Sequence, residues 1–216
     1  MTTTLQPGIG ILNLQGGVIE HLDHFARLGI SAVRVKTPED LSGLSGLVIP
    51  GGESTCLFRL MNRFGITEAI SACCKSGMKV WGTCAGAILV AAEVVDEGKK
   101  LGLIDITVER NAFGSQLDSF TTEVEVPEVS DERLPLTFIR APKILKAGPD
   151  VRVLLRQRGY IAMAENDSVL VTVFHPELTP VLAFHAYFAR KCGLKPEYRP
   201  DTPWTSTSWT RHARIK

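Results

Sequence analysis

The sequence predicts an α/β fold with a mostly parallel central sheet and an added antiparallel or mixed portion. Short apolar runs alternate with segments of helical hydrophobic spacing in the first half of the chain, an order that builds a parallel sheet covered by helices. The second half changes to a succession of strand-like segments with few helices. The length of 216 residues, 44% of them hydrophobic, suits a single domain with a sizeable core.

The first half is expected to alternate strands and helices. The four strands expected there are residues 9–14, 32–35, 47–49 and 79–81. A first helix is indicated by Val18, Leu22, Phe25 and Leu28, which recur at helical spacing. Thr37 followed by a proline is typical of a helix start. Longer helices are expected over residues 55–75 and 85–95.

The second half is expected to add the mixed portion and a last helix. The strands expected there are residues 104–109, 120–126, 136–139, 151–155, 160–164 and 169–174. The last helix is expected over residues 181–190. We therefore expect one domain over residues 1–194 and a C-terminal tail over 195–216, as an arm or a disordered end.

Composition and charge exclude several classes of protein. Lysine and arginine number 24 against 23 acidic residues, and the one basic stretch is the short tail, so no nucleic-acid partner is expected. The most apolar window, residues 80–92, is about 13 residues long, against about 20 for a membrane helix, so no membrane association is expected. The five cysteines form no disulfide pattern, which favours a reducing, cytoplasmic location.

A candidate nucleophile lies between a predicted strand and a predicted helix. Residues 82–86 read Gly-Thr-Cys-Ala-Gly, the form of a nucleophile elbow with cysteine in place of serine. Such a turn needs small neighbours so that Cys84 can stand exposed above the sheet, and the N–H of Ala85 can help to hold a developing oxyanion. A buried structural cysteine between two glycines is the alternative interpretation.

A candidate base follows the last predicted strand. Residues i and i+2 of an extended segment face the same side, and Pro176 biases His175 toward extended backbone. Glu177 could then bind one ring nitrogen of His175 while the other nitrogen faces a thiol, which is the logic of a catalytic triad. Taken alone, this segment reads as a surface turn, but together with the elbow it favours a catalytic cysteine.

A third candidate element is the loop over residues 50–54, Pro-Gly-Gly-Glu-Ser. A double glycine after a strand lets a ligand approach the backbone closely, and its N–H groups could complete an oxyanion hole. An ordinary strand-to-helix turn with Ser54 as the helix cap is the alternative.

Six motifs in one order resemble a known family. They are residues 14–16 with the Glu-His pair at 20–21, then 50–55, 82–86, 109–114, 138–142 and 174–178. Residues 82–86 and 174–178 resemble triad-type (class I) glutamine amidotransferases. The whole set, spanning about residues 8–192, is similar to the glutaminase subunits of pyridoxal 5′-phosphate synthase, the PdxT or SNO family. Ser115, Asn13 and Ala87 depart from the usual family pattern.

The resemblance implies a flavodoxin-like, three-layer α/β sandwich and an enzyme that hydrolyses L-glutamine to L-glutamate and ammonia. Cys84, His175 and Glu177 would form the triad, with a γ-glutamyl thioester as intermediate. The N–H groups of Gly52 and Ala85 would form the oxyanion hole. The glutamine site would be lined by Gly52, Glu53, Ser54, Arg110, Ile139 and Arg140.

Physical chemistry is consistent with the implied glutamine site. Free glutamine carries an ammonium and a carboxylate, so Glu53 can meet the first and Arg110 or Arg140 the second. Gln15 ends the first predicted strand, where open α/β sheets bind ligands, and by resemblance it lies near the oxyanion region and the ammonia exit. No cofactor and no metal are expected. The spacing of His21 and His24 could suit a metal, but a surface or interface role is expected for both.

The resemblance also implies a partner. In this family the glutaminase delivers ammonia to a synthase subunit with a (β/α)8 barrel, which makes pyridoxal 5′-phosphate in a large ring assembly. Two other classes stay open from the residues alone. One is a cysteine peptidase or deglycase of the PfpI type, which usually carries histidine where this chain has Ala85. The other is a regulatory subunit that kept the fold without turnover.

Overall fold

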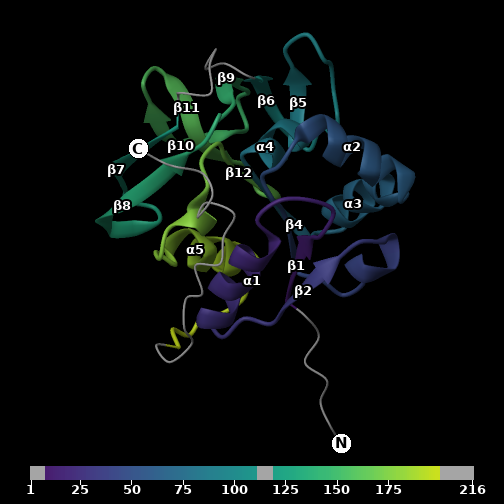
Figure 1. Cartoon of the computed structure of the whole chain (residues 1–216), viewed down its shortest axis with the longest axis horizontal. Helices are drawn as coiled ribbons and strands as arrows, with labels where there is room; N and C mark the ends of the chain where they lie inside the picture. Colours follow the sequence, from purple (N-terminus) through teal and green to yellow (C-terminus); the bar gives the residue numbers. More distant parts are fainter. Residues whose placement is uncertain (1–7, 111–118, 200–216) are drawn as a thin grey trace, which may run out of the picture.

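A curved ten-stranded sheet runs through the molecule, with helices on both of its faces (Figure 1). The computed structural model describes residues 8–110 and 119–199. The strand order is β2-β1-β3-β4-β12-β11-β9-β6-β5, and β10 pairs with β11 beside this path. The predicted three-layer α/β class is confirmed.

The parallel part of the sheet carries the strands nearest the candidate site. It consists of β2 (Ala32–Val35), β1 (Ile9–Leu12), β3 (Gly46–Ile49), β4 (Lys79–Thr83) and β12 (Val169–Thr172), each parallel to its neighbour. The strands β1, β3 and β12 are buried at every position, as expected where helices cover both faces of a parallel sheet. Their carboxyl ends meet at one edge, the usual place for a ligand.

The second half of the chain supplies the mixed portion. Strands β9 (Lys143–Ala147), β10 (Arg152–Gln157) and β11 (Tyr160–Glu165) make antiparallel pairs. At the far edge, β5 (Ala91–Val94) and β6 (Ile104–Glu109) are parallel to each other. The hairpin of β7 (Phe120–Val126) and β8 (Ser130–Phe138) forms a separate two-stranded sheet. The predicted antiparallel or mixed addition is therefore present.

The helices form two groups on the two faces of the sheet (Figure 1). One face carries α1 (Val18–Arg27) and α5 (Ala183–Lys191), which contact each other. The other carries α2 (Ser54–Arg63), α3 (Ile66–Lys75) and α4 (Ala85–Val90). Two short 3-10 helices, η1 (Pro38–Leu41) and η2 (Pro176–Leu178), follow β2 and β12.

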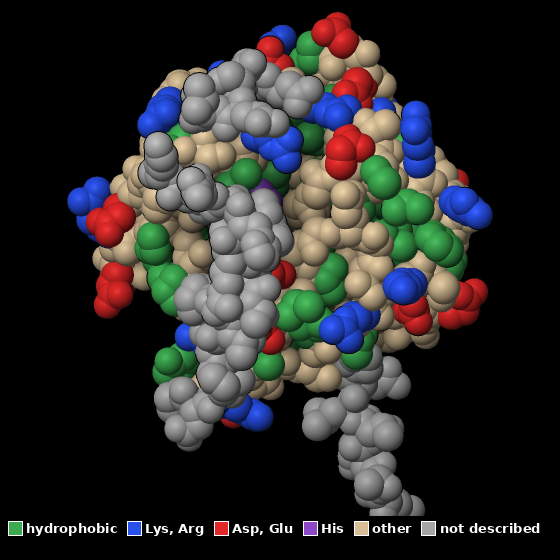
Figure 2. Space-filling model, in the orientation of Figure 1, with side chains coloured by type: hydrophobic (Ala, Val, Ile, Leu, Met, Phe, Trp, Pro, Cys, Tyr) green, Lys and Arg blue, Asp and Glu red, His purple; other side chains and the backbone are tan. Residues whose placement is uncertain are grey.

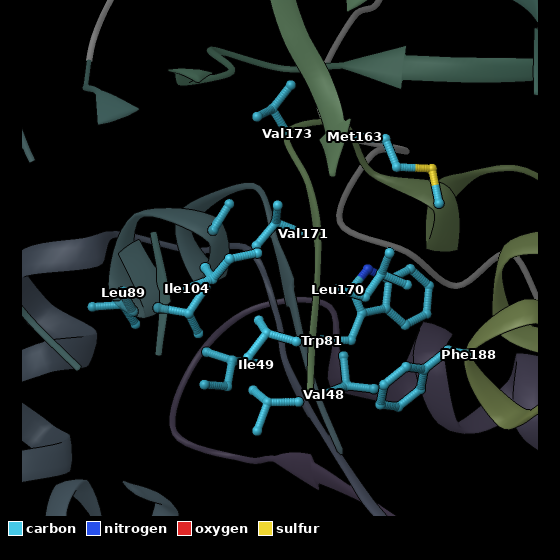
Figure 3. Packing of buried hydrophobic residues seen from close by; sticks show 14 of the residues in the cluster. Val48, Ile49, Trp81, Leu89, Ile104, Met163, Leu170, Val171, Val173 and Phe188 are labelled. Atoms are coloured by element: carbon cyan, nitrogen blue, oxygen red, sulfur yellow. The ribbon is translucent and has the colours of Figure 1, made fainter. Parts of the chain in front are cut away.

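The hydrophobic core lies on both sides of the central strands (Figure 3). Trp81 and Phe188 are fully buried on the side of α5, while Leu89 and Ile104 lie on the side of α4. Each fully buried large apolar side chain contributes on the order of 1.5–3 kcal/mol, so these two layers account for much of the folding energy. The indole N–H of Trp81 donates to Oγ1 of Thr172, 3.2 Å away, so its burial leaves no orphaned donor.

Two helices are shorter than the sequence predicts. The helix expected over residues 55–75 is interrupted near Gly65, whose left-handed backbone (φ 65°) lies between α2 and α3. The helix expected over residues 85–95 ends at Val90, because the next residues leave the helix and pair with β6 as β5. The strand β9 was not expected, since in it only Ile144 is buried and no clear alternation is visible.

The four cysteines outside the elbow differ in their exposure. Cys74 is buried and Cys73 and Cys192 are half-buried, but Cys56 is exposed near the start of α2. All five cysteines are free thiols.

The end of the domain is described as far as residue 199. The N–H of Glu197 donates to the carbonyl of Leu28, so this segment lies beside the end of α1. Residues 200–216 and Ser115 lie outside the described residues, and the boundary near residue 194 stays a prediction. In the described part of the chain, no helix is long and apolar enough to cross a membrane.

Candidate active site

A cavity of about 440 Å³ opens at the carboxyl ends of β1, β3 and β4, within the usual range of about 300–1,000 Å³ for small-molecule sites. In Figure 2 a small area of histidine surface is visible in a recess near the centre of the face, with basic and acidic side chains at its rim. The residues that line the cavity are Gln15, Gly16, Gly17, Gly51, Gly52, Glu53, Ser54, Cys84, Ala85, Ile88, Arg110, Ile139, Arg140, Pro142 and His175.

Cys84 occupies a strained turn between β4 and α4. Its backbone angles are φ 49° and ψ −106°, a region that non-glycine residues rarely adopt. The flanking glycines are required by close backbone packing, because a Cβ on Gly86 would lie 2.0 Å from the carbonyl oxygen of Ile49. A Cβ on Gly82 would lie 2.5 Å from the carbonyl oxygen of Gly86. The predicted strained elbow is therefore present.

Neighbouring strands place the thiol beside its candidate base. The N–H of Cys84 donates to the carbonyl of Thr172, 2.8 Å away, at the end of β12. The Sγ atom lies 4.0 Å from the carbonyl oxygen of Ile139, and the charge of Cys84 is one cause of the raised pKa of His175. A Cβ on Gly51 would lie 2.5 Å from Cε1 of His175 and 3.3 Å from Cβ of Cys84, so only glycine fits between the imidazole and the neighbouring loop.

His175 and Glu177 form a buried pair. Nδ1 of His175 lies 2.7 Å from Oε1 of Glu177, and the N–H of His175 donates to the carbonyl of Thr137 at 2.8 Å. The sequence predicts an extended segment here, and that is wrong: residues 176–178 form the 3-10 helix η2. The tight turn nevertheless brings the carboxylate back under the imidazole, so the predicted partnership holds by a different local geometry.

Electrostatics keep this pair in the charged form. Burial alone would lower the pKa of His175, but the charges of Cys84 and Glu177 and hydrogen bonds to both raise it well above its ordinary value. Burial alone would raise the pKa of Glu177, but the charge of His175, the proximity of His21 and a hydrogen bond from His175 lower it to about 2. The imidazolium form is thus favoured beside the thiol.

Three loops are tied together around the cavity. The N–H of Gly51 donates to Oγ1 of Thr83 at 3.1 Å, and the N–H of Glu53 donates to Oε1 of Gln15 at 3.2 Å. Gly16 has φ +100°, and a Cβ there would lie 1.7 Å from the carbonyl oxygen of Gly51. The loops after β1 and β3 therefore touch backbone to backbone.

Two of the predicted substrate-binding residues pair with each other. Nη2 of Arg110 lies 2.6 Å from Oε1 of Glu53, and Nη1 of Arg110 lies 2.8 Å from Glu97 and 2.7 Å from Oγ1 of Thr55. Glu53 is also the N-cap of α2, because its carboxylate accepts from the N–H groups of Thr55 and Cys56. These contacts with Glu97 and Thr55 were not predicted, since they join segments far apart in the sequence.

The remaining predicted residues come from the loop after β8 and from α2. Ile139 and Arg140 follow β8, and Arg140 has a left-handed backbone (φ 44°). Ser54 is not the helix cap, since Glu53 has that role. Its hydroxyl is buried and has no hydrogen-bond partner among the described residues, which leaves it available to a molecule in the cavity.

The structure brings every predicted site residue to the cavity except Glu177, which lies behind His175. The prediction of a surface or interface role for His21 and His24 is wrong, because both are fully buried with His185 on the inner side of Glu177. Within residues 8–110 and 119–199, no cluster of three or more ligand-type side chains has the arrangement of a metal site.

Comparison with known proteins decides the family. A model of the SNO glutamine amidotransferase family matches residues 11–194. The chain belongs to this family. Among SNO relatives, the pyridoxal 5′-phosphate synthase subunit PdxT of Syntrophus aciditrophicus is 57% identical over 210 residues, or 95% of this chain and 94% of that protein. The PdxT subunit of Ruminiclostridium cellulolyticum is 45% identical over 183 residues, covering 84% and 97%.

Solved structures agree with this membership of the SNO family. A crystal structure of a glutamine amidotransferase matches with a TM-score of 0.81 and 40% identity, covering 86% of this chain and 99% of the other. A GMP synthase subunit from Thermoplasma acidophilum matches with a TM-score of 0.64 at 14% identity, which supports the fold alone. The chain is a glutamine amidotransferase, and its relatives exclude the PfpI-type alternative.

Proposed function

We propose that this chain hydrolyses L-glutamine to L-glutamate and ammonia through a triad of Cys84, His175 and Glu177. The observation that supports it is the geometry at the cavity: a strained cysteine beside a histidine whose Nδ1 lies 2.7 Å from a buried carboxylate. This is the nucleophile, base and orienting group of a cysteine triad.

The reaction begins at the side-chain carboxamide of glutamine. The Sγ of Cys84 attacks the carboxamide carbon, and the C=O electron pair moves to oxygen to give a tetrahedral oxyanion. The C–N bond then breaks, the imidazolium of His175 gives its proton to the departing ammonia, and a γ-glutamyl thioester remains. The neutral imidazole next takes a proton from water, whose oxygen attacks the thioester carbon. The C–S bond then breaks, glutamate leaves, and the thiolate and the imidazolium are restored.

Glu177 acts without touching the substrate. Its carboxylate accepts from Nδ1–H of His175, which leaves Nε2 for the thiol, the ammonia and the water in turn. The low pKa of about 2 keeps this carboxylate ionised throughout the cycle.

The oxyanion and the two ends of glutamine are assigned to the residues around the cavity. The N–H groups of Gly52 and Ala85 stabilise the oxyanion, since both residues line the cavity beside Cys84. The substrate ammonium would meet Glu53 and its carboxylate would meet Arg110 or Arg140. Ser54, Ile139 and Gln15 line the same space, and we assign Gln15 to the ammonia exit.

The partner proposed for this chain is a synthase subunit that receives the ammonia. The relatives named PdxT are subunits of pyridoxal 5′-phosphate synthase, and this chain covers 94% of the length of one of them. We propose that the chain docks on a (β/α)8-barrel synthase subunit in a ring assembly and supplies ammonia for pyridoxal 5′-phosphate.

Ammonia release from glutamine, with and without the synthase subunit, tests the proposal. We expect release with the partner present, and we expect Cys84→Ala to abolish it while the variant folds and still binds the partner. A glutamine-like chloroketone should modify Cys84. Absence of ammonia with an active partner would refute the proposed activity, and a chloroketone adduct on another cysteine would reassign the nucleophile.

A further inference from the structure

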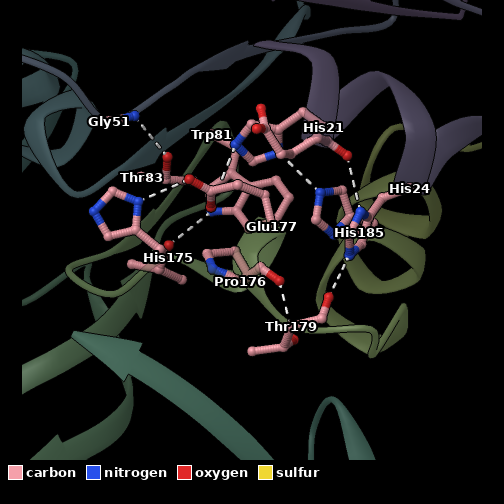
Figure 4. A network of polar contacts seen from close by, with 12 residues as sticks. His21, His24, Gly51, Trp81, Thr83, His175, Pro176, Glu177, Thr179 and His185 are labelled. Atoms are coloured by element: carbon pink, nitrogen blue, oxygen red, sulfur yellow. Dashed lines mark hydrogen bonds and ion pairs between the residues drawn. The ribbon is translucent and has the colours of Figure 1, made fainter. Parts of the chain in front are cut away.

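Three buried histidines lie behind the carboxylate of the proposed triad (Figure 4). His21 and His24 come from α1 and His185 from α5, and all three have no exposed surface. They pack against Trp81 as tilted rings, with ring centroids 5.0 Å apart for His21 and His185 and 4.3 Å apart for His24 and His185. The hydrolytic steps make no direct use of this cluster.

His21 connects the cluster to Glu177. Nε2 of His21 lies 3.6 Å from Oε2 of Glu177, the carboxylate oxygen that His175 does not use. Both atoms are buried, and neither has a hydrogen-bond partner within the part of the chain that the structure describes. On its other side, Nδ1 of His21 lies 2.8 Å from Nε2 of His185.

The proton between Nδ1 of His21 and Nε2 of His185 decides which nitrogen of His21 donates and which accepts. Nδ1 of His21 and Nε2 of His185 are close enough to share a hydrogen bond, so one of them carries the proton. With the proton on Nδ1 of His21, its bare Nε2 would face the carboxylate with a lone pair. With the proton on Nε2 of His185, Nδ1 of His21 accepts, and Nε2–H of His21 faces the carboxylate.

The second arrangement is the favourable one. It places the Nε2–H of His21, and not a lone pair, opposite the buried carboxylate of Glu177. The one polar ring atom that then lacks a partner among the described residues is an acceptor, Nδ1 of His185. A doubly protonated His21 would also point a donor at the carboxylate. Burial lowers the pKa of His21 to about 4, so the ring is neutral near pH 7.

We propose that His21 and His185 are positioning residues for the triad: His185 donates Nε2–H to His21 and fixes its tautomer, and His21 directs its Nε2–H at the second oxygen of Glu177, 3.6 Å away, as a charge–dipole contact. The carboxylate is then held from both sides, by His175 on one oxygen and by His21 on the other. This inference rests on the proposed function, because it assigns a role to groups that act through Glu177.

The groups that face His21 come from every element packed around it. They are Glu177 of η2, His24 of the same helix, His185 of α5 and, more remotely, His175. Among them His24 differs in its partners: Nδ1 lies 2.8 Å from the carbonyl oxygen of Glu20 and Nε2 lies 2.8 Å from that of Thr179. His24 therefore binds backbone and offers a matched control in the same cluster.

The tautomer can be measured in the unmodified full-length chain. Nitrogen-15 NMR of the histidine side chains distinguishes protonated from bare ring nitrogens. We expect His21 with a proton on Nε2 and none on Nδ1 at pH 7. A proton on Nδ1 of His21, with Nε2 bare, would overturn the proposal without any variant having to fold.

Three variants test the consequence for catalysis, measured as glutamine hydrolysis in the complex with the synthase subunit. His21→Leu should lower kcat by about tenfold, because the buried carboxylate loses the donor that faces its second oxygen, with KM changed less than about twofold. His21→Gln should recover most of the loss, because its amide N–H can reach the carboxylate. His24→Gln should keep kcat within about twofold of the parent.

The outcomes separate this inference from the proposed function. If the chloroketone fails to modify Cys84 in the parent, the triad itself fails. If it modifies Cys84 but His21→Leu folds and keeps the parental kcat, the triad stands and the positioning role of His21 is refuted. Equal losses in His21→Leu, His21→Gln and His24→Gln would refute it as well, since they indicate a packing effect only.

Discussion

At the scale of single residues, the site depends on a buried carboxylate, Glu177, that lies outside the cavity. Glu177 has no contact with the cavity, yet it controls the proton position on His175 through a 2.7 Å contact. A carboxylate in this place can only accept, whereas an amide can also donate and so can stabilise the wrong tautomer of the imidazole.

Glu177→Gln should therefore lower kcat for glutamine hydrolysis by about a hundredfold or more, with little change in KM. Steady-state kinetics of the complex with the synthase subunit measures both values. Glu165→Gln is the matched control, because Glu165 is also a buried carboxylate but pairs with Arg152 and Lys191 away from the cavity. A kcat for Glu177→Gln within about threefold of the parent would contradict the assignment.

At the scale of elements, the turn between β4 and α4 is the part of the fold most sensitive to an added atom. Gly86 passes so close to β3 that a Cβ would lie 2.0 Å from the carbonyl oxygen of Ile49. Backbone cannot move aside as the end of a flexible side chain can, so the strand and the turn would have to separate.

Gly86→Ala should lower the free energy of unfolding by at least about 1–3 kcal/mol, the usual cost of overpacking a core. Gly65→Ala serves as the control: its site has positive φ but open space around it, so only the strain of about 1–2 kcal/mol applies. Denaturant unfolding of both variants measures the difference. A smaller loss for Gly86→Ala than for Gly65→Ala would show that the turn is not tightly packed.

The sequence predicts most of these elements because their signals are local. A few consecutive positions are enough to indicate the strand β4, the small residues around Cys84 and the Gly-Gly loop. The pairing of Arg110 with Glu53 and the contact of His21 with His185 are not, since they join segments 57 and 164 positions apart. The break at Gly65 is a weak signal inside a strong helical pattern, and β9 depends on its neighbours in the sheet more than on its own alternation.

At the scale of the whole molecule, the buried histidines link stability to pH. Burial lowers the pKa of His21 to about 4, lowers that of His24 and lowers that of His185 well below its ordinary value. The unfolded chain takes up protons at these histidines near pH 6.5, whereas the folded chain does not.

The free energy of unfolding should therefore decrease as the pH falls from about 6.5 toward 4, by up to about 1.4 kcal/mol per pH unit for each histidine. His175 has a raised pKa and acts in the opposite direction: it stabilises the fold as the pH falls through 6.5, so it offsets part of the loss between pH 7 and 6 and adds little slope below about 6. Glu177, with a pKa of about 2, adds a further loss only below about 4.5. Denaturant unfolding at pH 7, 6 and 5 measures the slope, and constant stability over that range would contradict it.

The ion pair between Glu53 and Arg110 bears on which form of glutamine the enzyme accepts. Glu53 and Arg110 carry opposite charges, and free glutamine likewise carries one charge of each sign at its α-carbon. In the proposed binding mode the substrate ammonium replaces Arg110 beside Glu53, while Arg110 keeps Glu97 at 2.8 Å and can also meet the substrate carboxylate. A glutamine within a peptide carries neither charge at that carbon and would leave the carboxylate of Glu53 without a cationic partner. We expect selection for the free amino acid, and N-acetylglutamine amide should neither be hydrolysed nor compete with glutamine at equal concentration.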